Sequence, residues 1–127
     1  MKNVAVEGMV VTYKVVETPV TVVATLGPAS PHAKVDGKGI YLDGLLLTAA
    51  SWSIPQGQLV YAGVGPMTAS FSSSAEYVNV DGKKVLLDGD TATLSVTATN
   101  TENPEDTRSF TITATISDSG QANVTAE

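Results

Sequence analysis

The sequence predicts an all-β protein, and three observations carry that prediction. Period-two alternation runs through "TATLSVTAT" and "FTITATI", which places the apolar side chains on one sheet face and the hydroxyls on the other. The apolar residues are mostly Val, Ala, Leu and Ile, with only 6% aromatics, and such small or β-branched residues suit thin layers between strands. Finally, the best helical window, "LDGLLLTAASWSI", contains Gly44 and several hydroxyl residues, so we expect at most one short turn there.

The elements follow in chain order. The β-branched runs "VAVEGMVVTYKVV" and "VTVVATL" predict strands near the N-terminus. "TATLSVTAT" and "FTITATI" are expected to pair as an antiparallel hairpin across the polar "NTENPEDTRS", and "QANVTA" to form a final strand. Four prolines, Pro28, Pro31, Pro55 and Pro66, are expected to mark loops. No linker divides the chain, so residues 1–127 are expected to form a single domain.

A duplicated segment lies in the middle of the chain. "AKVDGKGIYLDG" at 33–44 and "VNVDGKKVLLDG" at 78–89 agree at seven of twelve positions. In each copy Asp-Gly predicts a tight two-residue turn, and a second turn follows at "LDG". The residues expected to build these turns are Asp36, Gly37, Lys38, Asp43, Gly44, Asp81, Gly82, Lys83, Asp88 and Gly89.

The duplication also predicts how the chain is organised. A repeated unit that cannot bury its own apolar face usually stacks against its sibling. We therefore expect a compact body of short hairpins, which could be conical, with a duplicated core over about residues 27–99. The alternating strands over about residues 91–127 would then be a C-terminal antiparallel extension.

Composition excludes several functions. The net charge is −6 and the sequence has no basic cluster, so neither nucleic acid nor an anionic membrane surface is an expected partner. The chain has no cysteine, which excludes disulfides and thiolate chemistry. Glu7, Gly8 and Lys14 interrupt the N-terminal apolar run, so we expect no signal peptide and no membrane insertion. We therefore expect the protein to be made in the cytoplasm and to stay there unless a specialised machine exports it.

No catalytic or metal-binding pattern emerges. His32, the one histidine, lies in "GPASPHAK" without a marked nucleophile or acid, which favours a loop histidine over a catalytic base. It cannot form a tetrahedral zinc site unless carboxylates or other chains supply the remaining ligands. "NVDGKKVLLDGD" has lysines where a calcium loop needs an oxygen ligand and a glycine, which favours turn roles for Asp81, Asp88 and Asp90.

Two other features are explained better by packing than by ligand binding. "YAGVGPM" does not fit a phosphate loop, so Gly63 and Gly65 are expected to serve close backbone packing or a turn. Trp52 is expected in the core, with an exposed docking patch as the alternative.

The duplicated unit resembles the PAAR-repeat proteins, which form the tips of contractile injection machines. In that family a motif of the form "v-x-v-n-G-k-p-a-x-x-x-D" recurs as a hairpin, and Gly37/Gly82, Lys38/Lys83 and Asp43/Asp88 match it. The resemblance covers roughly residues 27–99. Two features depart from the family: the Pro-Ala-Ala after Gly-Lys is absent, and the family typically binds zinc near its apex through histidines and a cysteine, whereas this chain has one histidine and no cysteine. No metal ligand is therefore assigned.

The resemblance implies a non-enzymatic structural protein without an assigned cofactor. One copy would cap the trimeric β-helical spike of a phage tail, a type VI secretion system or an extracellular contractile particle, help to pierce the target envelope, and be ejected with the particle. It could also carry an effector cargo. The Thr-rich "TATLSVTATNTENPEDTRSFTITATI" supports an alternative, a β-sandwich adhesin or a capsid or tail decoration module. A small hydrolase centred on His32 is a third, less favoured interpretation.

Overall fold

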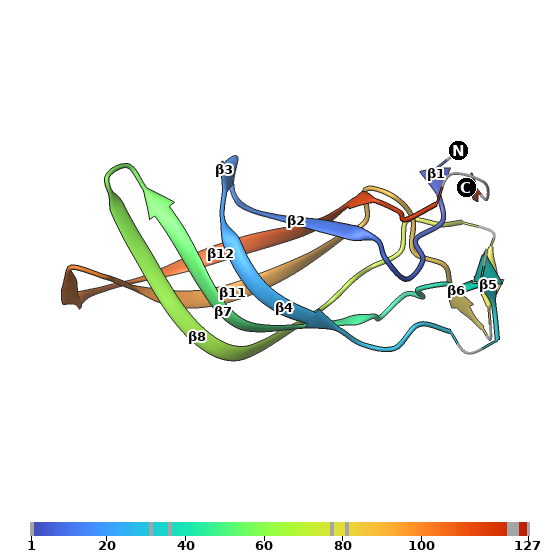
Figure 1. Ribbon diagram of the computed structural model, residues 1–127, viewed down its shortest axis with the longest axis horizontal. Helices are drawn as coiled ribbons and strands as arrows, with labels where there is room; N and C mark the ends of the chain where they lie inside the picture. Colours follow the sequence, from blue (N-terminus) through green and yellow to red (C-terminus); the bar gives the residue numbers. More distant parts are fainter. Residues whose placement is uncertain are drawn as a thin grey trace.

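The structure is a computed structural model, and it describes residues 2–30, 32–35, 37–76, 78–80, 82–121 and 125–126. Within these ranges the chain forms strands and turns and no helix, so the predicted all-β class is confirmed. Figure 1 shows an elongated molecule in which long, curved hairpins extend away from a compact end that holds β1, β5 and β6.

The long strands form one curled antiparallel sheet, a half-barrel with the order β3-β2-β12-β11-β8-β7-β4. The antiparallel pair expected after residue 90 is present, and it lies in the middle of this order, between β2 and β8. The strands are β2 (Val10–Val15), β3 (Thr18–Pro19), β4 (Thr21–Leu26), β7 (Leu46–Gln56), β8 (Leu59–Ser70), β11 (Thr91–Asn100) and β12 (Asn103–Asp118).

The curl brings the two ends of the strand order together. β3 and β4 stand at opposite ends of that order, yet only Val20 separates them in the chain. The amide of Val20 donates to the carbonyl of Tyr13 on β2 at 3.0 Å. The two ends of the sheet are thus linked at this connection, and the apolar side chains of the curled sheet belong to the main core.

Three short antiparallel pairs lie outside this sheet in the described part of the chain. We call their end of the molecule the cap. The pairs are β1 (Lys2–Asn3) with β13 (Thr125–Ala126), β5 (Lys34–Val35) with β6 (Lys38–Gly39), and β9 (Asn79–Val80) with β10 (Lys83–Lys84).

The predicted alternation is visible in β11 and β12. Ala92, Leu94 and Val96 of β11 are buried in the main core, as are Ile112 and Ala114 of β12. The intervening hydroxyl residues face outward and are register partners across the two strands: Thr91↔Thr115, Thr93↔Thr113, Ser95↔Thr111, Thr97↔Ser109 and Thr99↔Thr107. Threonine suits an exposed sheet face because its branched side chain packs well on its cross-strand neighbour.

The structure differs from the sequence expectation at β7 and at two prolines. The window that allowed one helical turn is strand β7, in which Leu47, Ala49, Trp52 and Ile54 are buried on either side of a register shift. Pro55 and Pro66, expected in loops, lie within β7 and β8. Pro66 falls at the register shift between the pairs Ser51↔Val64 and Ala49↔Met67, where its missing N–H removes no ladder bond.

Candidate functional site

The predicted turn residues that the structure describes lie in or next to the cap. In each copy two residues link the short strands, because Val35 pairs with Lys38 and Val80 with Lys83. Gly37 and Gly82 have φ of +79° and +80°, the left-handed conformation that a two-residue hairpin turn needs. Lys38 and Lys83 follow them and are exposed. Asp36 and Asp81 lie outside the described residues.

Each copy continues into a three-residue segment that ends in a second turn. After Ile40–Leu42 the amide of Leu45 donates to the carbonyl of Leu42, and after Val85–Leu87 the amide of Asp90 donates to that of Leu87, both at 3.1 Å. Asp43-Gly44 and Asp88-Gly89 are the central residues of these turns. Gly44 and Gly89 have φ of +85° and +90°, as the third position of a type II turn requires.

The structure contains a third copy that the sequence analysis missed. Val4–Val6 has the same form: the amide of Met9 donates to the carbonyl of Val6 at 3.0 Å, and Gly8 has φ of +94°. Its short pair is formed by β1 and β13, from the two ends of the described chain. The three copies share a five-residue pattern, in which apolar residues at the first and third positions are followed by an acid and a glycine. It reads "VAVEG", "IYLDG" and "VLLDG". It was hidden because this hairpin is not contiguous in sequence.

The three segments hydrogen-bond to one another in a closed cycle, which we call the ring (residues 4–6, 40–42 and 85–87). At its centre Ala5 N donates to Leu86 O at 2.8 Å, Leu86 N to Tyr41 O at 2.9 Å, and Tyr41 N to Ala5 O at 3.0 Å. The flanking bridges follow the same cycle: Val4↔Leu87, Val6↔Ile40 and Leu42↔Val85. Each segment thus donates to one neighbour and accepts from the other, as a pseudo-threefold axis requires.

A second cycle of bonds surrounds the first. Glu7 N donates to Gly39 O at 2.9 Å, Asp43 N to Lys84 O at 2.7 Å, and Asp88 N to Asn3 O at 2.8 Å. In each case the turn of one copy is bonded to the short strand that precedes the next segment. The predicted turn residues Asp43 and Asp88 therefore also connect neighbouring copies, because their backbone amides bond to the short strand of the next copy.

The ring separates two apolar clusters. The central side chains, Ala5, Tyr41 and Leu86, belong to the main core of the sheet. The alternate side chains of the ring belong to a second cluster, which we call the cap core: Val4, Val6, Val35, Ile40, Ala75, Val85 and Leu87. This alternation follows from the period of two in extended chain, and it fixes the ring from both sides.

Carboxylates anchor the ring to its surroundings. Asp90, only 4% exposed, accepts from Leu87 N at 2.7 Å and from Ser74 Oγ at 2.5 Å. Glu7 Oε1 accepts from Gly39 N at 2.6 Å, and Asp43 Oδ1 from Ser73 N at 2.7 Å. These acids satisfy backbone and hydroxyl donors, a structural use consistent with the turn role predicted for Asp90.

Each copy also leads into a hairpin of the main sheet at an equivalent residue. β2 begins one residue after Met9, β7 one residue after Leu45, and β11 one residue after Asp90. The hairpins have two-residue connections of the same length, 16–17, 57–58 and 101–102. The repeating unit is therefore a short pair, a ring segment, a turn and a hairpin; the hairpin is short in the first copy, where β2 pairs with β3 at two positions, and long in the other two.

Neither zinc nor a catalytic role for His32 gains support from the residues present. His32 is exposed, and its amide donates to Ser30 Oγ at 3.2 Å. The described residues include no group of three His, Asp or Glu placed to hold a metal ion, and the chain has no cysteine. The zinc that the resemblance implies does not fit this set of residues. No helix in the described ranges is long and apolar enough to cross a membrane.

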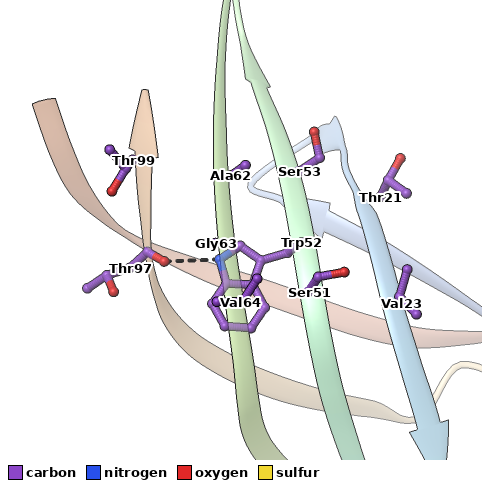
Figure 2. Close-up of a pocket in the computed structure, with 10 residues that line it drawn as sticks. All are labelled: Thr21, Val23, Ser51, Trp52, Ser53, Ala62, Gly63, Val64, Thr97 and Thr99. Atoms are coloured by element: carbon purple, nitrogen blue, oxygen red, sulfur yellow. Dashed lines mark hydrogen bonds between the residues drawn. The ribbon is translucent and has the colours of Figure 1, made fainter. Parts of the chain in front are cut away.

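Trp52 lies in the main core, as predicted, and is 4% exposed. Figure 2 shows its indole passing from β7 across Gly63 of β8 towards β11, where Nε1 donates to the Thr97 carbonyl at 3.0 Å. The predicted close packing of Gly63 is confirmed, because a Cβ added there would overlap the indole and lie 2.6 Å from that carbonyl. A groove of about 620 Å³ lies beside it, with no charged residue in its lining.

A polar cluster joins two long hairpins near their outer ends. The hydroxyl of Tyr61, on β8, donates to Asp106 Oδ2 on β12 at 2.6 Å, and Asn100 Nδ2 donates to the same oxygen at 3.3 Å. Arg108 Nε lies 3.2 Å from Asp106 Oδ1, and its guanidinium lies 4.9 Å from the centre of the Tyr61 ring. The hydrogen bond from Tyr61 lowers the pKa of Asp106, and the same bond, with burial, raises the pKa of Tyr61.

This cluster predicts a loss of stability in acid. A carboxyl whose pKa is lowered by folding stabilises the native state above its ordinary pKa of 3.8 and loses that contribution as the pH falls. We expect the free energy of unfolding, measured in urea between pH 3 and 7, to fall less steeply towards pH 3 in Asp106→Asn and Tyr61→Phe than in the wild type. Glu102→Gln controls for the loss of one negative charge at this end. Parallel curves for the wild type and Asp106→Asn would contradict the prediction.

Comparison with protein-family models, with curated proteins and with solved structures finds no match to this chain.

Proposed function

We propose that the protein is a non-enzymatic tip that caps the trimeric β-helical spike of a contractile injection machine, one copy per trimer, and helps to pierce the target envelope. The observation that supports this best is the ring, in which three chain segments are related by a closed cycle of hydrogen bonds. A single chain that caps a threefold partner has to offer similar contacts in three directions. Internal threefold repetition provides them, and the resemblance of two of the three units to PAAR repeats is independent support.

The mechanical properties of the fold agree with this role. Alternate ring side chains are buried in two different clusters, so the ring cannot shift without disturbing both. A tip that is driven into an envelope needs such resistance to shear. In this role the protein would be assembled onto the particle in the producing cell and ejected with the spike. The spike would identify the machine as a phage tail, a type VI secretion system or an extracellular contractile particle.

Light scattering after size exclusion tests the proposal, on the chain alone and mixed with the trimeric spike protein from the same genome. We expect a monomer of 13.1 kDa that adds one such mass to each trimer. A trimeric β-helical protein from an unrelated machine is the control and should leave the monomer unbound. Failure to bind the cognate spike, or a symmetric oligomer of the chain itself, would contradict the proposal.

One observation favours a decoration or adhesin module instead. The outer face of β11 and β12 is lined by Ser and Thr pairs, an uncharged surface of the kind that such modules expose. The strands, however, form one continuous curled sheet and not the two sheets of a sandwich. A chain that ignores the spike in the experiment above would make this the preferred function.

A further inference from the structure

We infer that one extended segment of a partner protein adds to the main sheet as an extra strand along β4. It would lie where β2 and β4 leave their edges open, at residues 11–13 and 22–26, which we call the seam. In the second and third copies the hairpin strands pair along their length, β7 with β8 and β11 with β12. In the first copy β2 and β4 share no register pair among the described residues, and Figure 1 shows them separating as they leave β3.

The backbone of β4 leaves hydrogen-bonding groups free at the seam. Gly27 N donates to Leu46 O of β7, and backbone groups along an antiparallel strand point alternately to its two sides. Val20 lies on the other alternation, and its amide bonds to Tyr13 O of β2. Beyond Val20 no described segment pairs with this edge of β4. The residues whose amides and carbonyls point to the open side are Val22, Ala24 and Leu26.

The main core is also less well covered at the seam. The apolar inward-facing residues of 92–98 and 112–116, on β11 and β12, are at most 4% exposed. The inward-facing residues of β2 and β4 pack against the same core but are only half-buried: Val11, Tyr13, Val15, Val22, Ala24 and Leu26. A strand with apolar side chains at alternate positions would cover this part of the core and pair with the free backbone groups at the same time.

The sequence of β4 does not protect its edge. Soluble proteins usually blunt an edge strand with charged residues, proline or a bulge in that strand. β4 reads "TVVATL", and the extra residue at its register shift, Ala50, belongs to β7. By contrast β3, at the opposite end of the strand order, has two residues and contains Pro19. β4 therefore offers an uncharged edge of six residues that can accept a strand.

A second opening in the sheet is filled by the chain itself. β8 and β11 share register pairs only at 61–62 and 99–100, apart from one isolated bridge at the other end. Where they separate, the indole of Trp52 crosses from β7 to β11 and donates to the Thr97 carbonyl (Figure 2). At the seam the largest side chain, Tyr13, is only half-buried. Because the seam occurs in one of the three copies, it fits a partner segment present once per chain and is distinct from a threefold contact.

Isothermal titration calorimetry with a synthetic peptide of residues 91–99, "TATLSVTAT", tests the inference. The peptide is a suitable probe because its Ala, Leu and Val side chains alternate and pack in the main core as part of β11. We expect one peptide to bind per chain. Leu94→Lys/Val96→Lys in the peptide should weaken binding about a hundredfold, because both charges would be buried. The matched control, Thr93→Lys/Ser95→Lys in the peptide, alters the outward face and should change binding less than about threefold.

Amide hydrogen exchange of the wild-type chain locates the added strand. The peptide should slow exchange of the Ala24 and Leu26 amides about tenfold or more, because they gain hydrogen bonds. The Thr25 amide points to β7 and should change little. In the chain, Ala24→Pro removes a free amide, which an edge position tolerates, and should weaken peptide binding about tenfold. Thermal unfolding establishes that this variant keeps its fold.

Four outcomes would overturn the inference. The first is a peptide that does not bind, and the second is equal binding of the two lysine peptides. The third is slowed exchange on β8 and β12 with none on β4, which would mean that the peptide had displaced β11. The fourth is a chain that dimerises with the β4 amides protected in the dimer, which would make a second copy the occupant.

Discussion

Leu86→Ala is expected to lower the free energy of unfolding by about 3 kcal/mol. Leu86 is fully buried, and it is the central residue of the third ring segment. Truncation leaves the backbone hydrogen bonds of the ring in place but removes the side chain that fixes this segment against the main core. The cost is the lost burial plus the cavity, because the ring is also held by the cap core on its other side and cannot collapse into the space.

Urea unfolding monitored by circular dichroism measures this effect, and Leu46→Ala is the matched control. Leu46 is 54% exposed at the start of β7, so its truncation should change the free energy of unfolding by no more than about 0.5 kcal/mol. A similar small loss for both variants would mean that the ring does not separate two packed cores.

Gly63→Ala is expected to cost about 1–3 kcal/mol, the usual range for overpacking a well-filled core. The added methyl would overlap Trp52 Nε1 and lie 2.6 Å from the Thr97 carbonyl, where neither the indole nor the β11 backbone can move freely. The indole would be pushed out and its hydrogen bond to Thr97 lost. Since Trp52 is the only tryptophan in the sequence, its fluorescence reports the displacement directly.

The matched control for this substitution is Gly27→Ala. A Cβ at Gly27 would have its nearest neighbours at 3.6 Å, an ordinary van der Waals distance. We expect little change in stability and an unchanged emission maximum for this variant, against a red shift and a lower urea midpoint for Gly63→Ala. Equal behaviour of the two variants would show that the indole does not occupy the space above Gly63.

The local sequence pattern was sufficient to predict the strands and turns whose conformation depends on adjacent residues. The alternation in 91–99 and 110–116 specified which face of β11 and β12 is buried, because side chains in extended chain point to opposite faces in turn. Asp-Gly specified the short hairpins around Gly37 and Gly82, because glycine adopts positive φ without steric cost. These are properties of a few adjacent residues.

Prolines and the helical window show where local pattern was insufficient. Pro66 is tolerated inside β8 only because a register shift leaves it out of the ladder, and such a shift is a property of two paired strands. β7 is a strand because β4 and β8 pair with it on both sides, which outweighs the weak helical tendency of "LLLTAAS".

By itself the sequence determined the all-β class, the duplicated turn unit and the burial of Trp52. Only the tertiary structure decided that the units number three and form a ring. The third short pair joins β1 to β13, which lie more than 120 residues apart in the chain. No continuous stretch of sequence therefore contains the whole hairpin. The ring is held by backbone amides and carbonyls, which every residue carries, and its side chains need only be apolar at alternate positions. A symmetry built from backbone hydrogen bonds therefore leaves only a short pattern in the sequence, apolar residues at alternate positions followed by an acid and glycine, and the hydrogen bonds between the three copies are a property of the tertiary structure alone.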